Sequence, residues 1–222
     1  MSARDIVLGK IRRSLGVTAT EPRRNATVDD RLRKAPKGVI PARGALPPAD
    51  QVALFAKMAA KVSATVEPVA DDASIPAAVA GYLRSQNLPA ALRMGDDALL
   101  NGLGWNRTAI EVRHGASDGT DAVGISRAIA GVAETGTLVL TSGRENPTTI
   151  NFLPETHVVV LKAADIAGDY ETVWARLRAT LGKGVLPRTV NFVTGPSRSA
   201  DIEQTLLLGA HGPRRLHILV VG

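Results

Sequence analysis

The spacing of hydrophobic residues divides the chain into a short N-terminal region and a longer body. Residues 3–15 carry apolar side chains at helical spacing, which predicts a short helix. Over residues 16–48 this periodicity is lost and five prolines interrupt a polar segment, so we expect irregular chain there. We therefore predict a basic N-terminal helix and arm over residues 1–48, followed by an α/β domain over residues 49–222.

In the body, short apolar runs alternate with segments of helical periodicity. Helices are predicted over residues 49–66, 75–85, 166–181 and 200–209, with a short one after Asp96 and a helical turn after Ile125. Strands are predicted around residues 66–69, 90–93, 109–112, 123–125, 134–140, 157–162, 189–195 and 216–222. Because the strands are runs of Val, Leu and Ile, we expect a mostly parallel sheet that is flanked by helices on both faces.

The composition narrows the kinds of partner that the protein could bind. Hydrophobic residues make up 45% of the 222 residues, while aromatic residues make up only 3%. Residues 1–43 hold 11 Lys and Arg against 4 Asp and Glu, a net of +7, so residues 44–222 carry −1 of the total +6. A basic segment can bind phosphates or dock on an acidic protein face. Since no aromatic side chains interleave with these charges to stack on bases, an acidic partner or a homo-oligomer is favoured over nucleic acid.

Missing residue types and patterns argue against several kinds of chemistry. The sequence contains no cysteine, so it offers no thiolate for a zinc ion or an iron–sulfur cluster. Its four histidines show no metal-binding spacing, and no metal site is predicted. We expect no membrane span, because no apolar run reaches about 18 residues. The N-terminus interleaves charged and apolar residues, so we expect no signal peptide and a cytoplasmic protein.

The turn after the predicted strand at 189–195 is the strongest candidate for binding an anion. In open α/β sheets, ligands bind beyond the carboxyl ends of strands, often against a helix N-terminus. Backbone amides, two hydroxyls and a guanidinium would be supplied here by Gly195, Ser197, Arg198 and Ser199. The same residues also suit a serine-capped helix whose acidic first turn complements the helix dipole. Spacing alone leaves both interpretations open.

Two further places could contribute to such a site. In AETGTLVL (133–140), Glu134 could act as a base, nucleophile or hydrogen-bond acceptor beside a ligand that approaches Gly136 and Thr137. The same turn could instead be a simple strand entry, in which the glycine adopts a conformation barred to other residues. His211 lies in a Gly-Pro turn before the last strand, where it could donate a proton or only form the loop.

Several segments, taken in order, resemble one known family. They are RDIVLGKIR near the start, then AETGTLVL, FLPETHVVVL, TGPSRSADIE and LLLGAHGPRRLHILVV. Together they resemble the lactate-utilisation protein C family, also called the LUD-domain family, over nearly the whole chain. The arm at 16–48 and the loop at 142–151 depart from the family pattern, so the resemblance assigns them no role.

The resemblance implies a role in oxidising L-lactate to pyruvate, alongside two partner proteins that carry iron–sulfur clusters. It also implies a fold similar to that of CoA transferases, ribose-5-phosphate isomerase and formyltetrahydrofolate cyclo-ligase, which bind anionic ligands at the carboxyl ends of strands. On this basis Glu134, Gly136 and Thr137 would line one wall of a cleft for a small anion. Ser197, Arg198 and His211 would lie opposite. From the shared turn chemistry we predict that Glu134 and the 195–199 loop lie at the same edge of the sheet.

Two classes of function follow. In the first, the protein is a subunit of a lactate-oxidising complex and contributes ligand binding or assembly. In the second, it is an independent enzyme similar to CoA transferases or isomerases, with Glu134 attacking an acyl group or moving a proton. Such an acyl transfer needs a nucleophile beside an amide that stabilises the oxyanion.

Overall fold

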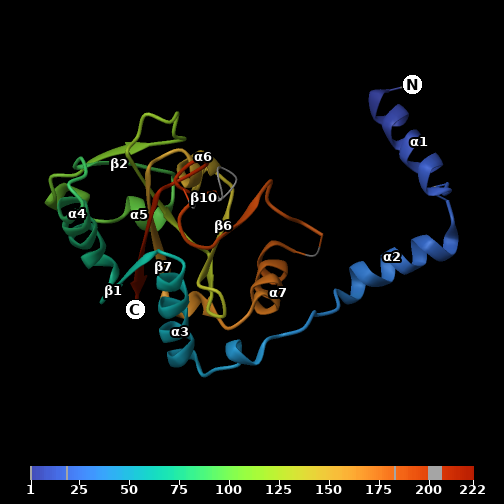
Figure 1. The fold of residues 1–222 in the computed structure, drawn as a ribbon, viewed down its shortest axis with the longest axis horizontal. Helices are drawn as coiled ribbons and strands as arrows, with labels where there is room; N and C mark the ends of the chain where they lie inside the picture. Colours follow the sequence, from blue (N-terminus) through green and yellow to red (C-terminus); the bar gives the residue numbers. More distant parts are fainter. Residues whose placement is uncertain (1, 19, 183, 200–206) are drawn as a thin grey trace. The chain divides into compact units, whose positions relative to one another are not determined.

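The computed structural model describes residues 2–18, 20–182, 184–199 and 207–222. By its internal contacts the chain forms two units, Met1–Val39 and Ile40–Gly222 (Figure 1). Residues 40–48, which the sequence assigned to the arm, therefore belong with the body. No helix in the described part of the chain is long and apolar enough to cross a bilayer.

The first unit contains helices α1 (Ala3–Leu15) and α2 (Pro22–Lys34). The first confirms the predicted N-terminal helix: the Ser2 hydroxyl accepts a hydrogen bond from the backbone N–H of Asp5, and the Asp5 carboxylate accepts from the Ser2 backbone in return. The second corrects the expectation of irregular chain. Its two large apolar residues, Val28 and Leu32, are one turn apart, a proline opens it, and three basic residues complement the dipole in its last turn. None of the residues in either helix is buried.

The second unit is built on a six-stranded sheet in which every neighbouring pair is parallel. Its strands, in spatial order, are β1 (Thr65–Val69), β12 (Arg215–Val221), β7 (Thr156–Lys162), β4 (Val123–Arg127), β2 (Ala91–Met94) and β3 (Glu111–His114). Successive side chains along the buried strands enter opposite faces, so that Val158 and Val160 pack on one face and Val159 and Leu161 on the other. This sheet confirms the predicted α/β class.

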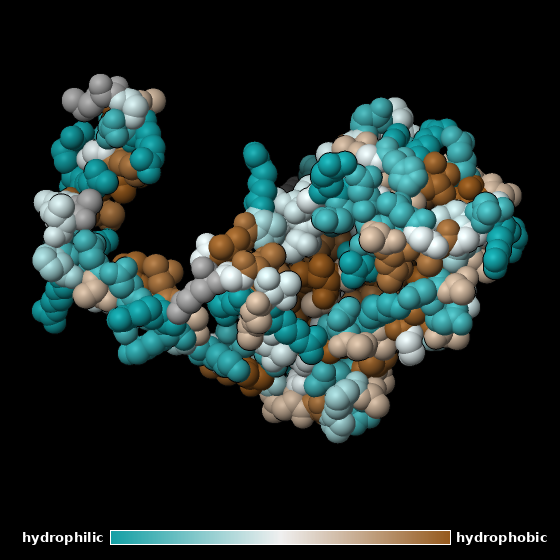
Figure 2. All heavy atoms as spheres, turned by 180° about the vertical axis from the view of Figure 1, so that it is seen from behind, coloured by the Kyte–Doolittle hydropathy of each residue, from teal (hydrophilic) through white to brown (hydrophobic). Residues whose placement is uncertain are grey.

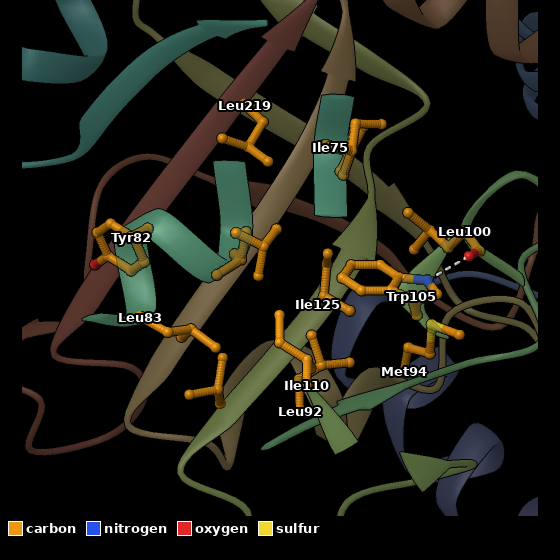
Figure 3. Close-up of a cluster of buried hydrophobic side chains, with 14 of the residues drawn as sticks. Ile75, Tyr82, Leu83, Leu92, Met94, Leu100, Trp105, Ile110, Ile125 and Leu219 are labelled. Carbon is orange, nitrogen blue, oxygen red and sulfur yellow. Dashed lines mark hydrogen bonds between the residues drawn. The ribbon is translucent and has the colours of Figure 1, made fainter. Parts of the chain in front are cut away.

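One face of the sheet is covered by α4 (Ile75–Ser85), α5 (Ala98–Asn101) and the 3-10 helix η3 (Trp105–Arg107). Figure 3 shows their side chains converging on Ile125 and Leu219 of the sheet. The Trp105 indole N–H donates to the Leu100 carbonyl at 2.8 Å, so the one polar atom of this large side chain is satisfied inside the core.

The other face is covered by α3 (Pro48–Lys61), α6 (Thr148–Phe152) and a second sheet. That sheet has the order β8 (Ile166–Ala167), β5 (Ala130–Val132), β6 (Thr137–Thr141) and β9 (Val190–Val193). Two of its pairings are antiparallel, and α7 (Tyr170–Leu181) packs against it. The core therefore lies in three layers: one on each face of the large sheet, and a third between the second sheet and α7.

Short elements complete the second unit. They are the 3-10 helices η1 (Ala42–Gly44), η2 (Asp72–Ser74) and η4 (Ala163–Asp165), and a two-stranded ribbon of β10 (Arg198–Ser199) and β11 (Leu207–Leu208). In the ribbon, Arg198 pairs with Leu208 and Ser199 with Leu207.

Besides α2 and α6, which the sequence analysis did not anticipate, the predicted elements differ from this fold in three places. The second sheet was not anticipated, because β5 and β8 are only three and two residues long. The turn expected after Ile125 is instead the approach to β5. The helix predicted over 200–209 falls on residues 200–206, which lie outside the described residues, while Leu207–Leu208 is a strand and not a helix end.

Candidate functional site

A pocket of about 270 Å³ opens between the large sheet, the end of β9 and the turn before β12. It contains three of the predicted ligand-binding residues, Gly195, Ser197 and Arg198, and the predicted proton donor His211. The remaining lining residues are mostly apolar or buried polar: Asn151, Phe152, His157, Phe192, Val193, Pro196, Gly212, Pro213 and Leu216. The pocket lies at the carboxyl end of β9, as expected for the turn after that strand. Because His157 and Leu216 are each the second residue of their strand, it also lies at the amino ends of β7 and β12 of the large sheet.

The 195–198 loop is fixed by its backbone. Gly195 has φ +77°, and a Cβ there would collide with the carbonyl oxygen of Val62 at the end of α3. Ser197 N–H donates to the Pro213 carbonyl at 2.8 Å, while the Ser197 carbonyl accepts from Gly209 at 2.9 Å. The Arg198 guanidinium donates to the Val62 carbonyl. The loop is therefore tied both to α3 and to the turn that carries His211.

Arg198 and His211 form the exposed rim of this pocket. His211 also lines a shallower neighbouring pocket of about 610 Å³, together with Arg214 and Glu155. Ser199 is one residue further along β10 and does not line the first pocket. Arg198 and Ser199 thus lie on β10 of the ribbon, and the predicted helix that would follow them falls on residues outside the described ones.

Glu134 lies outside this pocket. As predicted, its turn lies at the same edge of a sheet, here the second sheet, as the end of β9. At this edge the hydroxyl oxygens of Thr137 and Thr194 are 2.7 Å apart and share a hydrogen bond. The Glu134 side chain, however, is only 4% exposed and is packed beside the 3-10 helix η1, with Oε2 4.0 Å from Arg43 Nε. That oxygen is buried and has no hydrogen-bond partner in the described part of the chain.

Gly136 and Thr137 also face protein rather than the pocket. Gly136 has φ +68°, and a Cβ there would collide with the backbone nitrogen of Ala59 in α3. The Thr137 hydroxyl belongs to a cluster with Thr135, Tyr170 and Thr194, whose oxygens lie 2.7–2.9 Å apart. The strand-entry interpretation of this turn therefore accounts for both residues, which seat the second sheet on α3 and α7.

Three polar residues that the sequence analysis did not select lie at and beside the pocket floor. His157 Nε2 is 3.0 Å from Ser126 Oγ, and Ser126 Oγ donates to Asn151 Oδ1 at 3.0 Å. All three side chains are at most 1% exposed, and burial lowers the pKa of His157 to about 3. The sequence signal was present in FLPETHVVVL, where a histidine enters an otherwise apolar strand.

The other buried histidine has a different setting. His217 stacks on Tyr82 with ring centroids 3.7 Å apart, and its Nδ1 is 2.8 Å from the Thr65 hydroxyl. Burial lowers its pKa to about 4. It does not line the pocket. Among the described residues, no group of three or more His, Asp or Glu side chains is arranged to hold a metal ion.

These features define an α/β protein with a parallel six-stranded sheet and a second, smaller sheet, and with a part-polar pocket between them. The LUD domain family model matches residues 52–221, so the chain belongs to the LUD-domain family.

Relatives and a solved structure extend this finding. The chain is 40% identical over 100 residues to Lactate utilization protein C of Geobacillus thermodenitrificans, and 34% identical over 100 residues to that of Bacillus subtilis. Each match covers 45% of this chain and 42% of the relative, so it spans under half of those proteins. A crystal structure of a DUF162 family protein from Deinococcus radiodurans has a TM-score of 0.59 at 20% identity, covering 80% of this chain and 99% of that one. The last comparison supports the fold alone.

Proposed function

We propose that this protein is a subunit of a lactate-utilisation system, in which it binds a small carboxylate in the pocket formed by residues 195–198 and His211. Partner proteins that carry iron–sulfur clusters would oxidise L-lactate to pyruvate. Family membership and the names of the relatives support the process. The observation that carries the binding role is the convergence of Ser197, Arg198 and His211 on one pocket.

The chemistry of the rim suits a carboxylate. A guanidinium has five N–H donors, and the Val62 carbonyl occupies one nitrogen of Arg198, so other donors remain for an anion. Ser197 adds a hydroxyl, and Phe192 and Leu216 offer apolar surface for a short carbon chain. Electron transfer would fall to the partners, because the 222 residues contain no cysteine to hold a cluster.

A second candidate function rests on Glu134. A buried carboxylate with an unpartnered oxygen is a feature expected of a nucleophile or base, and it favours an independent enzyme similar to CoA transferases or isomerases. In this structure Arg43 and the 3-10 helix η1 lie against that carboxylate, so a substrate could reach it only if η1 moved. His211, the other proposed catalytic group, lines the separate pocket.

The deciding experiment measures L-lactate oxidation by the cluster-bearing partners with an artificial electron acceptor, with and without this chain. We expect oxidation to require the chain and to survive Glu134→Gln. Collapse of activity in Glu134→Gln, in a complex that still assembles, would favour the second candidate. Oxidation that proceeds equally well without the chain would contradict the proposed function.

A further inference from the structure

His157, Ser126 and Asn151 form a hydrogen-bonded polar row beneath the pocket, and the direction of donation along this row can be assigned. An amide oxygen only accepts hydrogen bonds, so the single hydroxyl hydrogen of Ser126 is committed to Asn151 Oδ1. His157 Nε2 must then carry its own hydrogen and donate it to Ser126 Oγ. In a neutral imidazole only one nitrogen is protonated, so His157 Nδ1 is left as a bare acceptor. The low pKa of His157 keeps the ring neutral at pH 7.

Two atoms of this row have no hydrogen-bond partner among the described residues. They are His157 Nδ1, an acceptor, and Asn151 Nδ2, a donor. Leaving a buried polar atom unpaired costs about 1–3 kcal/mol, so each of these atoms requires an explanation. Both residues line the pocket, whereas Ser126 does not. The unsatisfied atoms therefore belong to the residues that a ligand would meet.

An alcohol supplies what both atoms lack. Its hydrogen can be donated to His157 Nδ1, while its oxygen accepts from Asn151 Nδ2. A ketone or carboxylate oxygen can only accept, so it could satisfy Asn151 but would leave His157 unpaired. A methylene group would satisfy neither atom. The floor thus selects ligands that carry a hydroxyl group, and the rim with Arg198 selects ligands that carry a negative charge.

We propose that His157 and Asn151 form the hydroxyl-recognition floor of this pocket, and that its ligand is a small 2-hydroxy carboxylate. The carboxylate would lie toward Arg198 and the hydroxyl toward the floor. Ser126 is a positioning residue, because it fixes the tautomer of His157 without lining the pocket. The inference deepens the proposed function and rests on it for the carboxylate end of the ligand.

The first test is the binding of three probes to the full chain by calorimetry: L-lactate, pyruvate and propionate. They share a carboxylate and three carbons, but they carry a hydroxyl, a carbonyl and a methylene group at the second carbon. We expect L-lactate to bind roughly tenfold more tightly than either analogue, since each analogue leaves at least one buried atom unpaired. Equal affinities, or no binding of L-lactate, would overturn the inference.

Variants test which residues produce the preference for L-lactate over its analogues. His157→Phe and Asn151→Leu should bring the affinity for L-lactate down to that for propionate. His217→Phe is the matched control, because His217 is an equally buried histidine outside the pocket, and it should retain the preference. Loss of the preference in the control and not in the two pocket variants would overturn the assignment.

A measurement on the wild-type chain does not depend on the variants folding. With ¹⁵N-labelled histidine, the unprotonated Nδ1 of His157 should shift when L-lactate is added and stay unchanged with propionate. An Nδ1 resonance that ignores L-lactate would mean that the row is structural and that water meets its needs. If the Nδ1 resonance did not respond but lactate oxidation still required the chain, only this inference would fail. If the preference held while oxidation ignored the chain, only the proposed function would fail.

Discussion

At the scale of single residues, the two buried histidines show how their surroundings set protonation. His157 and His217 are 0% and 3% exposed, and burial lowers their pKa values to about 3 and about 4, from 6.5. Among the described residues, neither has a buried carboxylate against it that would favour the charged form. His217 Nε2 is 3.3 Å from Glu67, but that side chain is 43% exposed.

These pKa values predict acid destabilisation. Between pH 6.5 and about 4 the unfolded chain binds protons that the folded chain does not. The contribution of the two histidines to the free energy of unfolding is therefore complete above pH 6.5 and decreases as the pH falls below it. Each histidine contributes up to about 1.4 kcal/mol per pH unit in this window. Urea unfolding at pH 7 and pH 5 measures the loss. His217→Gln should reduce it, and His114→Gln, at an exposed strand end, should not. A loss that is the same in all three proteins would contradict the assignment.

Arg198 is exposed, and this limits what it can contribute to binding. Removing its guanidinium should weaken L-lactate binding by about 1 kcal/mol, near the upper end for an exposed charge pair. Calorimetry of Arg198→Ala measures the change. Arg113→Ala is the control, because Arg113 is an exposed arginine of β3 that pairs with Glu111 and does not line the pocket. An unchanged affinity in Arg198→Ala would exclude Arg198 from the site.

At the scale of elements, two glycine contacts hold the second sheet against α3. The turn before β6 and the turn after β9 both press against α3, at Ala59 and Val62 respectively. Gly136 and Gly195 each have positive φ and no room for a Cβ. The position of the pocket wall therefore depends on two close approaches of backbone to helix.

Gly136→Ala should be strongly destabilising for this reason. The substitution combines a left-handed backbone with a collision against Ala59, and we expect a loss of about 3 kcal/mol or more in the free energy of unfolding. The control is Gly115→Ala, which has φ +97° but open space around it, so it carries the backbone strain alone. Denaturant unfolding compares the two. Equal losses would show that the contact with α3 is not tight.

The sequence allowed the large sheet and α4 to be predicted, because long apolar strands and a helix opened by proline carry local signals. The second sheet could not be predicted. Its short strands are stabilised by partners far along the chain, such as β6 with β9. The 200–209 pattern suggested a helix, yet Leu207–Leu208 pairs with β10. Local periodicity does not register such cross-strand pairing.

The same limit applies to the site. Local turn chemistry singled out residues 195–199 and His211 separately, and the family resemblance grouped them into one site; residues 195–198 and His211 line one pocket. The burial of Glu134 depends on the segment around Arg43, about 90 residues earlier in the chain, so no local pattern reveals it. His157 was visible as a polar residue in an apolar strand, but its partners Ser126 and Asn151 come from other elements.

At the scale of the whole molecule, the basic charge and the core belong to different units. Residues 1–39 hold 10 Lys and Arg against 4 Asp and Glu, a net of +6, while the buried clusters are formed by residues of Ile40–Gly222. Val7, Ile11 and Leu15 of α1 are 49–60% exposed, and Figure 2 shows hydrophobic residues among hydrophilic ones on this unit. The first unit is therefore suited to contact another molecule rather than to stabilise the body.

Deleting residues 1–39 should leave the body folded, with an unchanged unfolding midpoint, because no residue of α1 or α2 is buried. The deletion should reduce self-association or capture of the cluster-bearing partners, as measured by light scattering and pull-down. A full-length chain with Arg12 and Arg13 changed to Gln separates charge from apolar contact. If both oligomeric mass and capture are unaffected by the deletion, the unit has no role in assembly.

The place of β12 in the large sheet has a consequence for how the protein is made. This strand, Arg215–Val221, lies between β1 and β7, although β1 precedes it by about 150 residues. A ribosome therefore releases β1 and β7 long before the strand that joins them, and during that time each exposes an unpaired edge. The nascent chain cannot complete its central sheet until residue 221 has emerged. We expect folding of the newly synthesised protein to depend on chaperones that shield strand edges.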